Sequence, residues 1–106
     1  MFYEIRRYQA RPGGRDEWVR YMEDIVIPYQ QSKGMTVVGS FVDEEDADGY
    51  VWIRRFEDEQ DRVTRYADTY EDPQWTDHIR PAVSQLLLLD RTVVTRVHPT
   101  SASPMQ

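Results

Sequence analysis

The 106-residue chain contains no cysteine, only five glycines and no long hydrophobic run. Without cysteine it can form no disulfide, zinc ribbon, iron–sulfur cluster or thiolate nucleophile. The longest aliphatic run covers residues 86–89, and the N-terminal segment has neither a basic nor an apolar block. This pattern predicts no signal peptide and no membrane span, so we expect a cytoplasmic protein.

Positive charge is also scarce, because 13 Lys and Arg stand against 19 Asp and Glu, for a net charge of −6. A sequence-independent nucleic-acid binder needs clustered positive charge, so nucleic acid is not an expected partner. Two distant histidines do not supply a transition-metal centre. The acidic stretch 43–49 lacks the final Glu of a calcium loop, since Arg55 stands at that position. We therefore predict no metal and no cofactor.

The size of the chain predicts one domain, because about a hundred residues bury roughly two thirds of their unfolded surface. Aromatic residues are plentiful, with 3 Trp, 7 Tyr and 3 Phe against four leucines. Aromatic side chains must therefore fill much of the core. Residues 1–98 carry the periodic patterns and form the predicted domain, whereas residues 99–106 are small, polar and aperiodic and predict a flexible tail.

The first half of the chain predicts a strand, a helix and two more strands. Residues 2–10 alternate as a strand does, and Pro12-Gly13-Gly14 ends the alternation. A helix follows from Arg15, bent by Pro28 and ended by Gly34. Its predicted apolar stripe consists of Trp18, Met22, Ile25, Val26 and Tyr29. Strands are predicted over residues 35–42 and 50–56, with a hairpin turn at Asp48-Gly49.

The second half predicts helices and a last strand. Residues 63–70 carry apolar side chains at helical spacing, and Asp72-Pro73 suits the start of another helix. Pro81 kinks that helix or divides it in two. Its predicted stripe consists of Trp75, Ile79, Val83 and Leu86. Residues 87–97 are predicted as the last strand.

The resulting order is strand, helix, strand, strand, helix, strand, which is typical of an α+β protein. Two right-handed crossovers around a central hairpin give a four-stranded antiparallel sheet in the order 4-1-3-2, with the helices on one face. The other face would leave apolar side chains exposed. Burying that face against a second copy predicts a homodimer.

Three short motifs resemble the NIPSNAP family, and the likeness covers residues 2–96. They are Tyr3-Glu4-Ile5-Arg6-Arg7-Tyr8 with Pro12-Gly13, the strand Val51-Trp52-Ile53-Arg54-Arg55-Phe56, and Asp72-Pro73-Gln74-Trp75. The resemblance implies a ferredoxin-like βαββαβ protomer that pairs into a dimeric α+β barrel. That superfamily also contains cofactor-independent monooxygenases and polyketide cyclases, which work in a pocket between sheet and helices. NIPSNAP members mostly lack an assigned reaction, and some are adaptor or membrane-associated proteins, so the fold does not settle the chemistry.

Polar and aromatic side chains share one face of two neighbouring predicted strands. They are Glu4, Arg6 and Tyr8 on the first strand and Trp52, Arg54 and Phe56 on the second. A buried carboxylate needs a partner, so we expect Glu4 to pair with Arg6 or Arg54. The group forms either the floor of a ligand pocket, where Arg holds a carboxylate, phenolate or enolate, or a structural ion pair at the dimer interface.

Further candidates lie on the predicted helices. Trp52, Tyr66, Tyr70 and Trp75 line a flat cavity for an aromatic ligand or fill the core. His78 stands three residues after Trp75, at the shoulder of the apolar stripe, and is either a general base or an ordinary, partly exposed histidine that packs on Trp75. His98 is expected at the surface.

These patterns favour a homodimeric protein that binds a small aromatic or polyketide-like molecule. As an enzyme it would be a cofactor-independent monooxygenase or a cyclase/isomerase. His78 or a tyrosine would remove a proton beside a carbonyl, and Arg6 or Arg54 would stabilise the oxyanion. The alternative is a non-catalytic dimeric interaction or adaptor module. A haem-binding relative is a third option, and it would need His78 or His98 to ligate iron.

Overall fold

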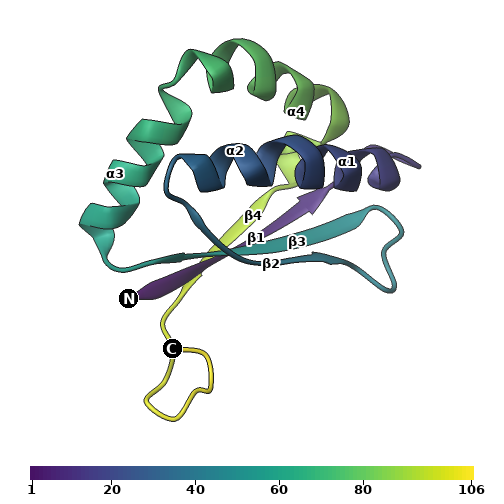
Figure 1. Ribbon diagram of the computed structural model, residues 1–106. Coiled ribbons are helices and arrows are strands. Elements are labelled where there is room, and N and C mark those ends of the chain that lie inside the picture. Colours follow the sequence, from purple (N-terminus) through teal and green to yellow (C-terminus); the bar gives the residue numbers. More distant parts are fainter.

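The computed structural model describes residues 1–106, and it has two layers, a sheet and a set of helices (Figure 1). The elements in chain order are β1 (Phe2–Gln9), α1 (Arg15–Tyr21), the π-helical turn η1 (Met22–Val26), α2 (Ile27–Ser32), β2 (Thr36–Val42), β3 (Gly49–Phe56), α3 (Glu59–Tyr70), the π-helical turn η2 (Gln74–Ile79), α4 (Arg80–Leu86), the 3-10 turn η3 (Leu89–Arg91) and β4 (Val93–Val97). All the helices lie on one side of the sheet (Figure 1). None of them is long and apolar enough to cross a membrane.

The sheet has the order β2-β3-β1-β4, and each neighbouring pair is antiparallel. The predicted α+β class, strand order and placement of the helices are therefore confirmed. In the central pair Glu4 lies opposite Arg54 and Arg6 lies opposite Trp52. Because side chains alternate between the faces of a strand, the polar and aromatic group predicted on β1 and β3 faces the helices.

The first long helix consists of α1, η1 and α2, and it buries every fourth residue. Its fully buried side chains are Trp18, Met22, Val26 and Gln30, each at most 2% exposed. Four residues overshoot a complete α-helical turn by roughly 40°, so a regular helix would carry this row out of the core. The wider π-helical turn η1 keeps the row in line, and it also accommodates Pro28, which cannot donate the next backbone hydrogen bond.

The predicted stripe of this helix is wrong at one position for the same reason. Ile25 is 41% exposed, whereas the polar Gln30 is fully buried. The π-helical turn rotates Ile25 away from the sheet and brings Gln30 toward it. Gly34 ends the helix with φ of +91°, as its predicted role as a cap requires.

The second long helix consists of η2 and α4, and it has the same arrangement as the first. Its π-helical turn η2 again precedes a proline, Pro81, at the start of α4. Ile79 and Leu87 are both 1% exposed. The predicted last strand is shorter than expected, because Leu87 turns into the core and pairs with Ala10 in an isolated β-bridge. The strand β4 begins only at Val93.

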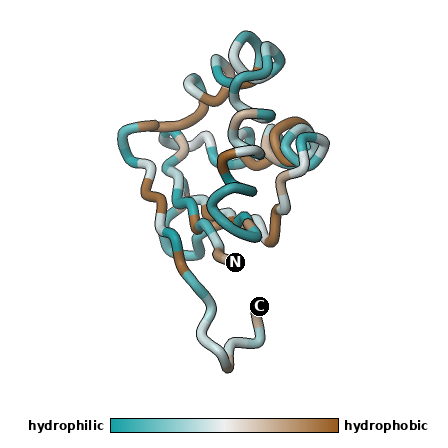
Figure 2. The backbone as a smooth tube through the Cα atoms, turned by 90° about the vertical axis from the view of Figure 1, so that its left-hand side faces the viewer, coloured by the Kyte–Doolittle hydropathy of each residue, from teal (hydrophilic) through white to brown (hydrophobic).

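The uncovered face of the sheet carries exposed apolar side chains. Phe41 on β2 lies opposite Val51, and its side chain is 52% exposed. Val93 on β4 lies opposite Arg7 and is 55% exposed. The chain after β4 extends away from the body of the molecule (Figures 1 and 2). It returns so that the Tyr3 hydroxyl donates to the carbonyl oxygen of Gln106 at 3.0 Å.

Candidate functional site

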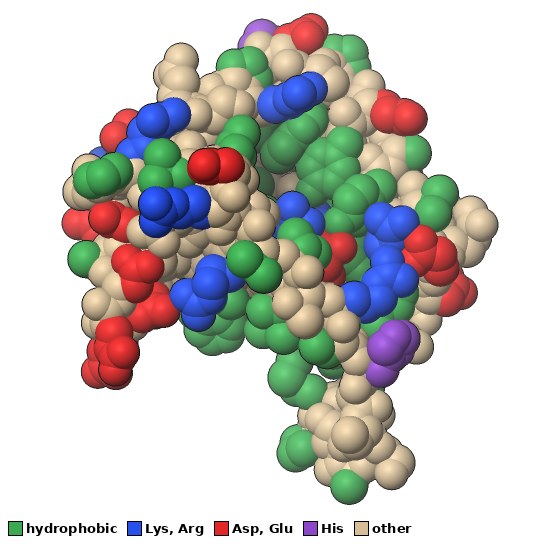
Figure 3. Space-filling model, turned by 180° about the vertical axis from the view of Figure 1, so that it is seen from behind, with side chains coloured by type: hydrophobic (Ala, Val, Ile, Leu, Met, Phe, Trp, Pro, Cys, Tyr) green, Lys and Arg blue, Asp and Glu red, His purple; other side chains and the backbone are tan.

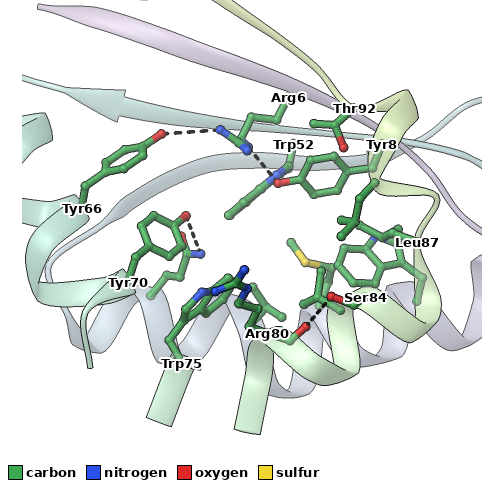
Figure 4. Close-up of a pocket in the computed structure, with 16 residues that line it drawn as sticks. Arg6, Tyr8, Trp52, Tyr66, Tyr70, Trp75, Arg80, Ser84, Leu87 and Thr92 are labelled. Atoms are coloured by element: carbon green, nitrogen blue, oxygen red, sulfur yellow. Dashed lines mark hydrogen bonds between the residues drawn. The ribbon is translucent and has the colours of Figure 1, made fainter. Parts of the chain in front are cut away.

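A cavity of about 270 Å³ lies between the sheet and the helices (Figure 4). Most of its lining side chains are hydrophobic, and they come from β1, β3, both long helices and α3. In the space-filling view, hydrophobic side chains gather in a hollow with basic and acidic groups inside it (Figure 3). Six of the predicted site residues line the cavity. They are Arg6, Tyr8, Trp52, Tyr66, Tyr70 and Trp75.

A buried ion pair stands behind the cavity wall. Arg54 Nη2 donates to Glu4 Oε1 at 2.5 Å, and Arg6 Nη1 donates to the same oxygen at 3.1 Å. Glu4 therefore pairs with both of the arginines named as alternatives. The Tyr66 hydroxyl donates to the other carboxylate oxygen, Oε2, at 2.6 Å. With three donors the Glu4 carboxylate is firmly held, as a buried carboxylate must be.

Arg54 is enclosed completely, with no exposed side-chain surface. Its Nη1 donates to Gln30 Oε1 at 2.8 Å and to the Tyr70 hydroxyl at 2.6 Å. Its Nη2 donates to the Tyr66 hydroxyl at 2.8 Å in addition to Glu4. Its guanidinium carbon also lies 4.9 Å from the centre of the Trp52 ring, within range of a cation–π interaction. Arg54 does not line the cavity, so it holds the cavity's side chains in place.

Gln30 is the member of this network that the sequence analysis missed. A polar residue at the end of an amphipathic helix is normally exposed. The signal that could have found it is its place four residues after Val26, in the row that begins at Trp18. Reading that row requires the π-helical turn, which the position of Pro28 alone did not reveal.

Arg6 is the cation that reaches the cavity. Its side chain is 20% exposed and lines the wall. Its Nε donates to the Tyr8 hydroxyl at 2.8 Å, which fixes the guanidinium over the sheet. Figure 4 shows Arg6 and Tyr8 on the sheet side of the cavity and Trp75 and Arg80 on the helix side.

The charges shift the pKa values of the acidic groups. Burial raises the pKa of Glu4, but the attraction of Arg54 and Arg6 and the hydrogen bonds from Arg54 and Tyr66 outweigh it, so the pKa is lowered overall. Burial raises the pKa of Tyr66 to about 12. At neutral pH the carboxylate is thus ionised and the Tyr66 phenol keeps its proton. Neither group is poised to take a proton from a ligand.

Four predicted site residues do not line the cavity. Glu4 and Arg54 lie behind its wall, and His78 and Phe56 lie farther from it. His78 is exposed, and it is not among the lining residues. In η2 the row facing the core runs from Trp75 to Ile79, four residues apart, so the third residue after Trp75 points outward. Both histidines lie at the edges of the face that bears the hollow (Figure 3).

Phe56 is the last of these four residues. It is buried beside Phe2, with ring centres 5.6 Å apart, and it packs on Tyr66 at 6.0 Å. Phe56 therefore supports the wall formed by Tyr66 without lining the cavity.

The structure also brings residues to the cavity that the sequence analysis did not assign to it. They are Trp18, Met22, Val26, Gln30, Arg80, Val83, Ser84, Leu87, Leu89 and Thr92. Most belong to the two helix rows, so they share the signal described for Gln30. No group of three or more His, Asp or Glu side chains is placed to hold a metal ion.

A four-stranded antiparallel sheet covered by helices on one face, with a cavity between the layers, defines a ferredoxin-like α+β protein. The structure of an antibiotic biosynthesis monooxygenase shares this fold, with a TM-score of 0.66 at 14% identity over 94% of this chain and 99% of that one. The NIPSNAP family model matches residues 3–104, and the chain belongs to the NIPSNAP family.

Solved structures of the family are more similar still. Protein Atu4242 from Agrobacterium tumefaciens has a TM-score of 0.89 at 29% identity, with both chains covered completely. An uncharacterized NIPSNAP-like domain protein from Burkholderia xenovorans has a TM-score of 0.85 at 29% identity, over 97% of this chain and 88% of that one. No curated protein matches the sequence.

Proposed function

We propose that this NIPSNAP protein is a homodimer that binds a small aromatic or polyketide-like molecule between the sheet and the helices. The observation that carries the proposal is the cavity, with its aromatic walls and a few convergent polar groups, which is the usual make-up of a small-molecule site. Its volume of about 270 Å³ is near the lower limit of roughly 300 Å³ for ligand pockets. A ligand of one to a few rings suits that size.

The cavity supports one part of the chemistry of a cofactor-independent monooxygenase or a cyclase/isomerase. Arg6 is placed to stabilise an enolate oxygen of a bound substrate. Proton abstraction has no suitable side chain in the cavity. His78 lies outside it, and the Glu4 carboxylate is held by three hydrogen-bond donors. A reaction here would therefore use a substrate that ionises readily by itself.

Native mass spectrometry of protein purified gently from its own host tests the binding proposal. We expect a dimer that carries an organic molecule, and we expect Val83→Trp to lose that molecule because the indole would fill the cavity. Val63→Trp is the control, since Val63 is 48% exposed on α3. A dimer that is empty in both the wild type and the control would contradict the proposal and favour the alternative, a non-catalytic interaction module.

The proposed homodimer rests on the uncovered face of the sheet. A contiguous apolar patch is rare on the surface of a monomer, and a second copy can cover it in a closed, symmetric way. We expect Phe41→Lys to raise the dimer dissociation constant at least tenfold, because it places a charge in the proposed interface. Analytical ultracentrifugation measures this change, with Val63→Lys as the control. A monomeric wild-type protein would refute the homodimer.

A further inference from the structure

We infer that the molecule bound in the cavity is an aromatic acid whose carboxylate is held by Arg6. This inference rests on the proposed function, and it adds the chemical class of the ligand. Three features of the cavity carry it: the balance of buried charge, the hydrogen-bond donors that have no acceptor, and the apolar character of the remaining walls.

The first feature is an excess of positive charge. Arg54 and Arg6 meet a single carboxylate, Glu4, and their side chains are 0%, 20% and 6% exposed, respectively. No Asp or Glu is among the lining residues, and the other charged residue that lines the cavity, Arg80, is also a cation. A charge withdrawn from water requires a counter-charge. The carboxylate of a ligand would supply the one that the protein does not.

The second feature is a set of donors without acceptors. Arg6 uses Nε and Nη1 for hydrogen bonds within the protein, which leaves Nη2 unused. The Tyr8 hydroxyl accepts from Arg6, and its own proton meets no acceptor. The Tyr70 hydroxyl accepts from Arg54 and Gln30, which leaves its proton free as well.

Two of these donors are in direct contact, because Arg6 Nε and the Tyr8 hydroxyl are 2.8 Å apart. Figure 4 shows Arg6 and Tyr8 on the sheet side of the cavity, and Tyr70 faces the same space from α3. Buried polar groups are almost always hydrogen-bonded. A carboxylate is the group that accepts only, through two oxygens in one plane, and a guanidinium is the group that holds it best. A ligand with a neutral amide would offer a single acceptor oxygen and no charge to Arg6, and it would add donors to a wall that is already rich in them.

The third feature is the remainder of the cavity, which is mostly apolar, although Arg80, Ser84 and Thr92 also line it. Trp75, Val83 and Met22 come from the helix layer, and Leu87 directly follows α4. An aromatic ring system carried by the carboxylate would therefore lie against flat and aliphatic surfaces. The polar end and the apolar end of the cavity together match an aromatic acid.

Two isosteric probes test the inference, 2-naphthoate and its neutral counterpart 2-naphthamide, titrated into the 106-residue protein and followed by calorimetry. We expect the wild type to bind naphthoate at least tenfold more tightly than naphthamide. Arg6→Gln should reduce this preference to within about threefold, and Arg20→Gln, at an exposed position of α1, should leave it unchanged. Tyr8→Phe, which keeps the ring, should weaken naphthoate several-fold and affect naphthamide less.

Three results would overturn the inference. Equal affinity for the two probes, with both abolished by Val83→Trp, would remove the carboxylate assignment and leave aromatic binding in place. Loss of the preference for naphthoate in Arg80→Gln but not in Arg6→Gln would show that Arg80, on the helix side of the cavity, holds the carboxylate instead of Arg6. Failure of both probes to bind would count against the proposed function itself.

Discussion

Replacement of Glu4 by glutamine is expected to lower the free energy of unfolding by about 3–5 kcal/mol, the usual consequence of removing one partner from a buried ion pair. Glutamine keeps the shape of the side chain but removes its charge. Arg54, which has no exposed surface, and Arg6 would then face each other without a counter-charge. Urea unfolding followed by circular dichroism measures the change.

The surface offers a matched control. Glu59 receives hydrogen bonds from Arg62 and an ion pair from Arg96, yet its side chain is 53% exposed. Glu59→Gln removes a carboxylate with two arginine partners, as Glu4→Gln does, but water solvates the arginines that remain. We expect a much smaller loss of stability. Similar losses for the two variants would contradict a buried role for Glu4.

A double variant tests whether the loss of stability in Glu4→Gln comes from the charge of Arg54 that it leaves unpaired. Glu4→Gln combined with Arg54→Met removes both charges of the buried pair and leaves Arg6, which is partly exposed. It is expected to be more stable than Glu4→Gln alone, because the two residues are in direct contact and their effects should not add. A double variant less stable than Glu4→Gln would show that Arg54 acts mainly through its bonds to Gln30 and the tyrosines.

Lowering the pH should destabilise the wild-type protein as Glu4→Gln does, because protonation also removes the charge of Glu4. The pKa of Glu4 is lowered in the folded protein, so the unfolded chain binds its proton first. The stability that this carboxylate contributes is present above its ordinary pKa of 4.5 and is lost as the pH falls through the folded value. The variant Glu4→Gln should lack this part of the acid dependence.

The second large effect concerns the first helix, where Met22→Ala is expected to destabilise by about 2–5 kcal/mol. Met22 has no exposed surface and belongs to the main core cluster. Ile25→Ala truncates a side chain of similar size three residues later, which is 41% exposed. We expect it to cost below about 1 kcal/mol. Thermal or urea unfolding of the two variants gives the comparison.

This pair of variants tests the π-helical turn directly. A regular α-helix that carried the predicted stripe would bury both side chains and give similar losses for both. A large loss for Ile25→Ala would therefore contradict the register that η1 imposes on this helix.

Part of the candidate site could be predicted from alternation along strands. Glu4 and Arg6 on β1 and Trp52 and Arg54 on β3 share one side of the sheet, as expected, and the structure shows that the helices cover this side. The period of a strand is two residues and does not drift, so the residue numbers show which side chains share a face. The ion pairs of Glu4 followed from the same rule, because a carboxylate on that face needs a partner.

The positions of helix side chains could be predicted less well, because the period of a helix can change locally. A period of 3.6 residues places His78 at the shoulder of the stripe that contains Trp75, but the π-helical turn η2 advances the row by four residues and leaves His78 exposed. The same shift exposes Ile25 and buries Gln30. Proline explains why the turn widens, yet a proline is equally compatible with a kink or a break.

The sequence by itself determined the order of the elements, the order of the strands and which strand residues share a face, because local propensity, turn residues and crossover handedness act over short stretches of chain. Tertiary structure alone decided which helix residues reach the core, which arginine is enclosed and which one faces the cavity. Arg6 and Arg54 stand on equivalent faces of neighbouring strands. Their roles differ because Gln30, Tyr66 and Tyr70 close over Arg54. Those contacts join residues far apart in the chain, and they exist only once the two layers have packed.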